Sequence, residues 1–424
     1  MKRLLWIALA LLVTSVGCAA RSKLAQFAAP SPTASPRSRS RAGPFASSTL
    51  TPLPDTPTPS LTTFPTASAT VTWTREPSPT PTQTATTTPT PVPPPRVVAS
   101  YPIDGDRAVR AERALVVEFD RPMDKSSVST HLTFSPTVEG KIDWPTSQRV
   151  TFMPEGGWTA LSYEVILASG ATDIHGVAMQ EEFRLRFARK GHGAPVPILM
   201  YHNLKKLGDH PSEPQLTWTV SPEAFVAQMT YLAQKGWQSI SPAQLAAYLT
   251  DGEPLPRRAV MITMDDGYKE VYTLAYPLFA KLGFKPVLFI VPQYMGYGAY
   301  MDWGQLQELV KAGFIVGSHG YDHANLQKAS DTEVERQIGD SQSLLARRLG
   351  GTIDAFAYPY GYYDKRALVA LEKHHYVTAF TINPSIFQSS DHLYQLNRMV
   401  ITYTTGLEEF AGLLLRWPDV RLSL

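Results

Sequence analysis

Two adjacent carboxylates, Asp265 and Asp266, follow the apolar run 259–264 and precede Gly267. The run predicts a buried strand that ends at these carboxylates. Two like charges this close cannot both stay ionised unless a cation or strong hydrogen bonds lie beside them. Because Asp-Gly is also a common turn signal, the pair alone leaves two interpretations open, a solvated turn or a site where one Asp holds a metal ion.

Two histidines, His319 and His323, follow another predicted strand and stand four residues apart. Histidines at this spacing can share one turn of the chain and bind the same metal ion. With a carboxylate from another strand end they make a set of two imidazoles and one carboxylate, which leaves at least one coordination position open. Such a set is typical of a catalytic metal site rather than a closed structural one. A third predicted strand end carries Tyr-Pro-Tyr-Gly at 358–361.

Strands and helices alternate from residue 195 to residue 424. The predicted strands are 196–200, 259–264, 287–291, 314–316, 355–358, 377–382 and 398–401. The predicted helices are 222–234, 241–249, 268–282, 303–311, 331–349, 365–373 and 407–415. This alternation predicts an α/β fold with a parallel sheet, and we expect a closed (β/α) barrel. Functional side chains in such barrels lie at the carboxyl ends of the strands, where the three motifs stand.

The three motifs resemble those of the NodB-like polysaccharide deacetylases, carbohydrate esterase family four. Thr-Met-Asp-Asp-Gly at 263–267 is similar to the first family motif, with Met264 where Phe is usual. Ser-His-Gly-Tyr-Asp-His at 318–323 is similar to the second, with Gly320 where Ser or Thr is common, and 358–361 is similar to the end of the third.

The resemblance implies a NodB-like distorted TIM-type barrel and a metal-dependent N-deacetylase. By this resemblance Asp266, His319 and His323 bind a divalent metal, most often Zn²⁺, with Ni²⁺ or Co²⁺ as alternatives. Asp265 would be the general base, and the backbone N–H of Tyr360 would donate to the oxyanion. The opening motif Pro-Ile-Leu-Met-Tyr-His is similar to the branch that contains poly-N-acetylglucosamine deacetylases. The implied substrate is an N-acetylated polysaccharide that contains N-acetylglucosamine.

Three family features are missing from the sequence, and one of them is the later Asp-Trp motif. The Arg that orients the base usually opens the third motif, but 354–357 contains none, and Arg398 is the candidate substitute, with a surface Arg as the equal alternative. The late Leu-His motif that supplies the general acid is absent at 400–402, which leaves His202 and His392 as the available imidazoles and the general acid unassigned. These gaps keep two other functions open, a non-catalytic surface glycan-binding protein on a degenerate barrel and a metal-dependent amidase for non-sugar C–N bonds.

The N-terminus has the pattern of an export signal. Three residues with two positive charges precede the apolar run 4–16, and small residues surround Cys18. The segment 1–18 resembles a bacterial lipoprotein signal, which implies lipidation of Cys18 and a membrane anchor, and an ordinary signal cut near Ala19 is the alternative. Cys18 is the only cysteine, so the chain has no intrachain disulfide. We expect an exported protein, anchored to the membrane or extracellular.

The rest of the chain divides by composition. Residues 19–95 are rich in Pro, Ser and Thr and are expected to be a disordered linker, because they bury too little apolar surface to fold. Short alternating runs in 96–190 predict a small all-β sandwich. That segment resembles a bacterial Ig-like domain, and the barrel would follow at 195–424. The formal net charge of +2 argues against a nucleic-acid partner, and the sequence predicts no oligomeric state.

Overall fold

The computed structural model describes residues 92–189 and 193–415. The predicted signal 1–18 with Cys18 lies outside the described residues, as does the predicted linker 19–95 up to residue 91. Within the described part of the chain, no helix is long and apolar enough to cross a membrane.

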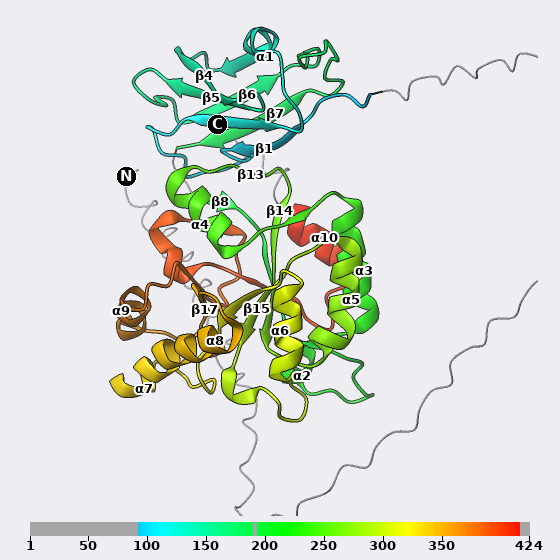
Figure 1. The fold of residues 1–424 in the computed structure, drawn as a ribbon, viewed down its shortest axis with the longest axis vertical. Coiled ribbons are helices and arrows are strands. Elements are labelled where there is room, and N and C mark those ends of the chain that lie inside the picture. Colours follow the sequence, from blue (N-terminus) through cyan, green and yellow to red (C-terminus); the bar gives the residue numbers. More distant parts are fainter. Residues whose placement is uncertain (1–91, 190–192, 416–424) are drawn as a thin grey trace, which may run out of the picture. The chain divides into compact units, whose positions relative to one another are not determined.

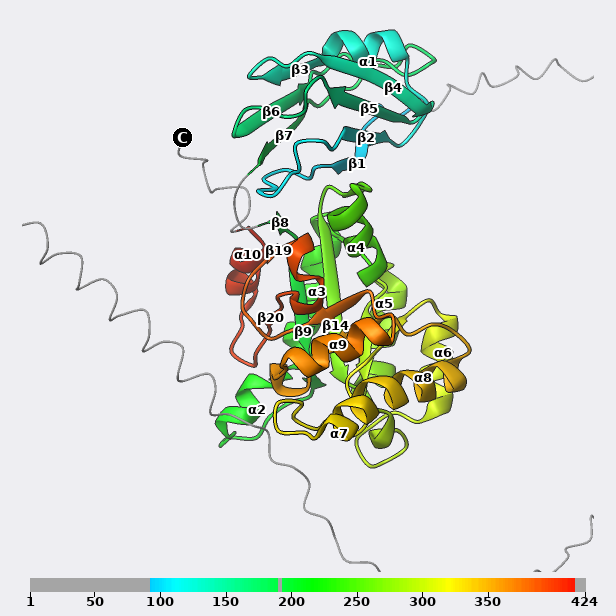
Figure 2. The same ribbon diagram turned by 90° about the vertical axis from the view of Figure 1, so that its left-hand side faces the viewer.

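A β-sandwich occupies the first described segment (Figure 1, Figure 2). Its elements are β1 (Val97–Tyr101), β2 (Leu115–Phe119), α1 (Lys125–His131), β3 (Leu132–Ser135), β4 (Gly140–Thr146), β5 (Arg149–Pro154), β6 (Ser162–Leu167) and β7 (Phe183–Ala188). The strands pair antiparallel in the orders β1-β2-β5-β4 and β3-β6-β7. Trp158 is 1% exposed and packs against Phe152, Tyr163 and Phe187 in the core. The predicted Ig-like sandwich is confirmed.

Strands β3 and β4 and helix α1 were not predicted from the sequence. The side chains of β4 are mostly exposed, so this strand lacks the alternation of apolar and polar residues by which strands are recognised. Helix α1 begins after Asp124, whose carboxylate accepts a hydrogen bond of 2.7 Å from the backbone N–H of Ser127.

The second described segment is built on a parallel sheet. Its strands are β9 (Ile198–Tyr201), β12 (Gln238–Ser239), β14 (Ala259–Asp266), β15 (Val287–Ile290), β16 (Ile315–Ser318), β17 (Ala355–Ala357), β18 (Thr378–Phe380) and β20 (Met399–Val400). They lie in the order β18-β17-β16-β15-β14-β9-β20, and β12 pairs with the start of β14. Shorter strands pair outside this sheet: β8 (Ala194–Pro195), β10 (Asn203–Leu204), β11 (Thr219–Val220), β13 (Leu255–Pro256) and β19 (Phe387–Gln388).

One short segment connects the two edges of the parallel sheet. Leu396 forms a parallel bridge with Phe380 at the end of β18, and the following residues Met399 and Val400 pair with β9. The sheet therefore curves round and closes through this segment. The predicted (β/α) barrel is confirmed in this distorted form, and the boundaries 96–190 and 195–424 stay predictions.

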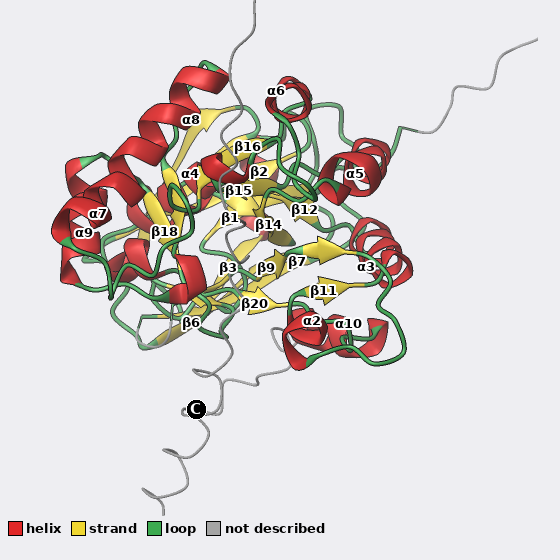
Figure 3. Cartoon of the chain, turned by 90° about the horizontal axis from the view of Figure 1, so that it is seen from below, coloured by secondary structure: helices red, strands yellow, loops and turns green. Residues whose placement is uncertain are grey.

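Helices surround the strands (Figure 3). The α-helices are α2 (Glu213–Thr217), α3 (Pro222–Gln234), α4 (Pro242–Asp251), α5 (Tyr276–Leu282), α6 (Trp303–Lys311), α7 (Asp331–Glu335), α8 (Ser341–Leu349), α9 (Lys365–Lys373) and α10 (Leu407–Leu415). The predicted helices 268–282 and 331–349 each contain a π-helical turn, at Val271–Ala275 and Arg336–Asp340. Such turns are rare and often lie at functional sites.

Strand β14 explains how the sheet orients the first motif. All of its residues are buried, as expected for a strand with packed structure on both faces. Val260, Ile262 and Met264 pack in the cluster beneath the helices, whereas Met261 packs in the opposite cluster. Since side chains alternate along a strand, Asp265 lies on the same face as Met261.

Candidate active site

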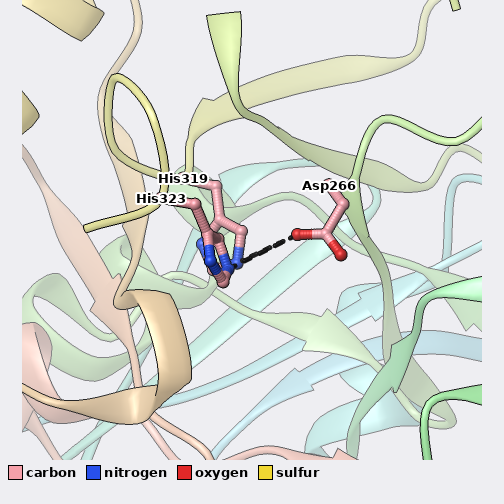
Figure 4. Close-up of side chains that lie close together, drawn as sticks. All are labelled: Asp266, His319 and His323. Atoms are coloured by element: carbon pink, nitrogen blue, oxygen red, sulfur yellow. Dashed lines mark ion pairs between the residues drawn. The ribbon is translucent and has the colours of Figure 1, made fainter. Parts of the chain in front are cut away.

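Three side chains from two strand ends converge at the carboxyl edge of the sheet. Asp266 ends β14, and His319 and His323 follow β16 (Figure 4). Nε2 of each histidine lies 3.6 Å from Oδ1 of Asp266, and the three possible ligand atoms lie within 4.8 Å of one another. Ligand atoms around a tetrahedral Zn²⁺ with bonds of about 2.0–2.1 Å lie about 3.3 Å apart. The structure thus brings together the three residues that the sequence analysis assigned to a metal.

The surroundings of the three side chains fit a cation. Nδ1 of His319 lies 2.7 Å from the carbonyl oxygen of Ala357, so this nitrogen donates the proton and Nε2 keeps its lone pair. Oδ1 of Asp266 is buried and has no hydrogen-bond partner among the described residues. A buried carboxylate oxygen without a donor is costly unless a cation binds it.

Asp265 is bound by an arginine through one oxygen, and its other oxygen, Oδ2, lies 3.8 Å from Nε2 of His319. Nη1 of Arg398 donates to Oδ1 of Asp265 at 2.8 Å and to Oγ1 of Thr263 at 3.2 Å, and Nε donates to the carbonyl of Thr381 at 2.9 Å. The side chains of Arg398 and Asp265 are 0% and 1% exposed. Of the two interpretations of Arg398, the geometry favours a buried partner of Asp265 over a surface residue.

Backbone strain is concentrated at the same edge. Asp266, His323 and Tyr360 have φ angles of 72°, 68° and 59°, a region that residues other than glycine rarely adopt. Each such residue costs about 1–3 kcal/mol, and such residues cluster at functional sites. The centres of the Tyr360 and His323 rings lie 4.4 Å apart. The third sequence motif therefore lies beside the first two.

Comparisons with known proteins agree with this geometry. Residues 252–379 match the family described as polysaccharide deacetylase, and residues 91–188 match the bacterial Ig-like domain. The chain carries a polysaccharide deacetylase domain. The enzyme family and the Ig-like domain that the sequence analysis named are thereby confirmed.

The relatives of the deacetylase domain are distant. YxkH of Bacillus subtilis (strain 168), whose polysaccharide deacetylase name is provisional, is 28% identical over 209 residues, which are 49% of this chain and 72% of that protein. The poly-β-1,6-N-acetyl-D-glucosamine N-deacetylase of Staphylococcus aureus (strain MSSA476) is 22% identical over 279 residues, 61% of this chain and 94% of that protein. The solved Streptococcus pyogenes deacetylase PplD in complex with acetate is 25% identical and covers 52% of this chain and 97% of its own, with a TM-score of 0.49.

The two carboxylates of the deacetylase domain have opposite pKa shifts. Burial would raise the pKa of Asp265, but the positive charge of Arg398, followed by His319 and His202, holds that pKa below its usual value. Burial, together with the neighbouring charge of Asp265 and against the opposing effect of His202, raises the pKa of Asp266 to about 6. Near neutral pH the pair therefore has one carboxylate held ionised and one that gains most from a bound cation.

Of the two imidazoles left over from the sequence analysis, His202 lies at the site. Its Nε2 is 3.9 Å from Oδ2 of Asp265, and its ring packs on Trp218 at 4.7 Å. Burial lowers the pKa of His202 against the attraction of Asp265. His392 lies in the turn Ser390–Gln395, and among the described residues no ion pair connects it with the site. The contact between His202 and Asp265 could not be predicted from the sequence, because the two lie 63 residues apart.

Tyrosine rings gather beside the metal-ligand candidates of the deacetylase domain. Tyr268 and Tyr294 pack against Tyr300 at 4.9 and 4.6 Å, and Tyr294 lies 6.3 Å from His323. Tyr297, in the same loop after β15, is 70% exposed. Exposed aromatic rings near a site are surfaces on which the apolar faces of sugar rings can pack.

Proposed function

We propose that the chain is a metal-dependent N-deacetylase that removes acetyl groups from polysaccharide containing N-acetylglucosamine. The proposal rests on one observation: the two adjacent carboxylates at the end of β14 have different partners. Asp266, His319 and His323 turn three ligand atoms toward one point. Asp265 lies beside them, ionised and held by Arg398 rather than by the ligand set.

We propose Asp266, His319 and His323 as the metal ligands, with Zn²⁺ as the first choice and Ni²⁺ or Co²⁺ as alternatives. When bound at such a site, the ion lowers the pKa of a water toward about 7 and polarises the substrate carbonyl. The donors, two imidazole nitrogens and one carboxylate oxygen, suit zinc and leave a position open for water and substrate.

The protein side chains supply the proton transfers in this proposal. Oδ2 of Asp265 has no hydrogen-bond partner among the described residues and accepts the proton of the attacking water. Arg398 fixes the other oxygen, Oδ1, so that the carboxylate cannot rotate. The backbone N–H of Tyr360 donates to the carbonyl oxygen as negative charge develops on it. We propose that the proton taken from the water passes from Asp265 to His202, whose Nε2 lies 3.9 Å from Oδ2 of Asp265, and from His202 to the leaving nitrogen, so that the C–N bond breaks to give acetate and an amine.

The substrate and the location are inferred from a relative, an exposed ring and the N-terminal sequence. The Staphylococcus aureus relative is named for poly-β-1,6-N-acetyl-D-glucosamine, and the exposed Tyr297 offers a packing surface for a sugar ring. We propose a cell-wall or cell-surface polymer as the substrate. The predicted export signal supports an extracellular site of action, with anchoring through Cys18 as part of the same proposal.

A substrate panel tests the function. Purified protein with Zn²⁺ is incubated with chitin oligomers, peptidoglycan and poly-N-acetylglucosamine, and released acetate is measured. We expect activity in the wild type and in Asp340→Asn, a control that changes an exposed carboxylate in the same domain. Asp265→Asn should lose about 10²- to 10⁴-fold in rate, the usual contribution of a general base.

The same panel separates the alternatives. Binding of a glycan without acetate release, whatever metal is supplied, would identify a glycan-binding protein on a degenerate barrel. Hydrolysis of small amides but not of acetylated sugars would identify an amidase. Equal acetate release by the wild type and by Asp266→Ala would show that the proposed ligand set is wrong.

A further inference from the structure

The loop that carries His323 has a strained backbone. His323 has a φ of 68°, and Gly320, three residues earlier, has a φ of 80°. The loop therefore leaves β16 through two left-handed positions before α7 begins. A histidine on such a backbone keeps its direction only if neighbouring structure holds the turn.

One buried amide holds this turn. The side chain of Gln337, in the π-helical turn Arg336–Asp340, is 0% exposed. Its Oε1 accepts hydrogen bonds from the backbone N–H groups of Tyr321 at 2.8 Å, Asp322 at 3.3 Å and Ala324 at 3.5 Å. These three residues flank His323 on both sides, so a single oxygen fixes the backbone on which the imidazole stands.

The amide nitrogen of Gln337 is satisfied as well, and this sets the orientation of the group. Nε2 donates to Oδ1 of Asp322 and to Oε1 of Glu333. Arg336 donates to the same two carboxylates, and its positive charge offsets part of theirs. If the amide were turned round, its NH₂ group would face backbone donors and its oxygen would face carboxylates, so the assigned orientation is the one that satisfies every group.

Gly320 makes room for this arrangement. A Cβ atom at position 320 would lie 2.6 Å from Oε1 of Gln337 and 3.2 Å from Cγ of Pro359. The departure from the Ser or Thr that is common in the second motif is thus coupled to the buried amide. A side chain at 320 and the amide of Gln337 compete for the same space.

We propose that Gln337 is a positioning residue for the metal site, which holds the turn at 321–324 so that His323 faces Asp266 and His319. The inference rests on the proposed function, because it takes these three residues as ligands. It adds a residue that lies outside the three motifs and contacts the ligand loop through three backbone N–H groups and the carboxylate of Asp322. Without the amide, the strained turn would relax and His323 would no longer face Asp266 and His319.

Zinc affinity measures this role directly. Metal-free wild type and Gln337→Leu are titrated with Zn²⁺ in competition with a coloured chelator. We expect the variant to bind about 10- to 100-fold more weakly, the usual effect of removing a group that orients a ligand. Gln342→Leu is the matched control, because the Gln342 amide bonds the backbone carbonyls of Ile353 and His374 rather than the ligand loop. Its zinc affinity should equal that of the wild type.

Hydrogen exchange in the metal-free proteins gives a second measurement that does not depend on zinc. The amides of Tyr321 and Asp322 should exchange faster in Gln337→Leu than in the wild type and in Gln342→Leu. If Gln337→Leu does not fold, Gln337→Asn carries both tests, because it withdraws the amide from the loop by one methylene and stays polar.

The outcomes separate the two proposals. If the wild type binds Zn²⁺ and His319→Ala does not, the ligand set is supported. If Gln337→Leu then binds with wild-type affinity, or its amides exchange at wild-type rates, the positioning role is overturned while the ligand set stands. If the wild type binds neither Zn²⁺ nor Ni²⁺ nor Co²⁺, both proposals fail.

Discussion

Replacing Arg398 with Met tests the role of its hydrogen bond to Asp265, the proposed general base. Met keeps an apolar side chain of similar length and removes the guanidinium, whose Cζ lies 5.4 Å from the centre of the Phe289 ring. Asp265 then loses the partner at 2.8 Å, and Thr381 loses a donor to its carbonyl. Asp265 remains buried, so its charge is left without compensation.

The burial of the pair sets the size of the effect. An exposed ion pair contributes about 0–1 kcal/mol, whereas removal of one partner from a buried pair costs about 3–5 kcal/mol. Because the two side chains are 0% and 1% exposed, the larger range applies to the free energy of unfolding.

The pH dependence of the effect has a definite sign. In the wild type, the pKa of Asp265 is lower in the folded than in the unfolded protein. Its pairing therefore adds stability above the unfolded pKa, and this stability is lost as the pH falls through the folded pKa. Without Arg398, burial raises the pKa of Asp265. The stability difference between wild type and Arg398→Met should therefore be largest near neutral pH and shrink in acid.

Two assays check the prediction. Urea unfolding at several pH values gives the stability difference, and acetate release against pH gives the acid limb of kcat, which should move to higher pH in Arg398→Met. Arg184→Met is the control, because Arg184 forms exposed ion pairs with Glu164 and Glu182. Its loss should be at most about 1 kcal/mol, with the acid limb unchanged. An Arg398 variant that behaves like this control would refute the assignment of Arg398 as the partner of the base.

Three further predictions follow from the structure. Because burial raises the pKa of Asp266 to about 6 and only the carboxylate binds metal, Zn²⁺ affinity should fall about tenfold per pH unit below that value and level off above it; a flat profile would contradict this. His202→Gln should lower kcat by about 10²- to 10⁴-fold with zinc affinity unchanged, and wild-type kcat would exclude it as the acid. Tyr248→Phe removes the O–H that donates to the buried carboxylate of Asp106, so the free energy of unfolding should fall by about 1–3 kcal/mol while kcat stays the same; an unchanged unfolding midpoint would show that this hydrogen bond contributes nothing.

Local signals were sufficient for much of the barrel. The bounds predicted for the helices 222–234 and 303–311 are those of α3 and α6. Both begin at residues that cap a helix, Ser221 and Asp302, whose side chains accept from backbone N–H groups of the first turn. The apolar run before Asp265 predicted β14 for a similar reason, since a strand buried on both faces has no polar interruptions.

Features that depend on distant parts of the chain were harder to predict. Arg398 is 133 residues from Asp265, and the sequence analysis could not choose between a surface residue and a partner of the base. Gln337 was not recognised at all, because a glutamine inside a helical pattern carries no local sign of burial. Both residues acquire their partners only when the sheet closes and the helices pack on it.

Diffraction data collected at the zinc absorption edge, from crystals of the protein with Zn²⁺, would show whether Asp266, His319 and His323 bind the metal. We expect a single anomalous peak in the deacetylase domain, bonded at about 2.0–2.2 Å by Oδ1 of Asp266 and by Nε2 of His319 and His323. Asp265 should stay on Arg398, outside the coordination shell. A peak bound by Asp265, or one at a different place with these three side chains unliganded, would contradict the account.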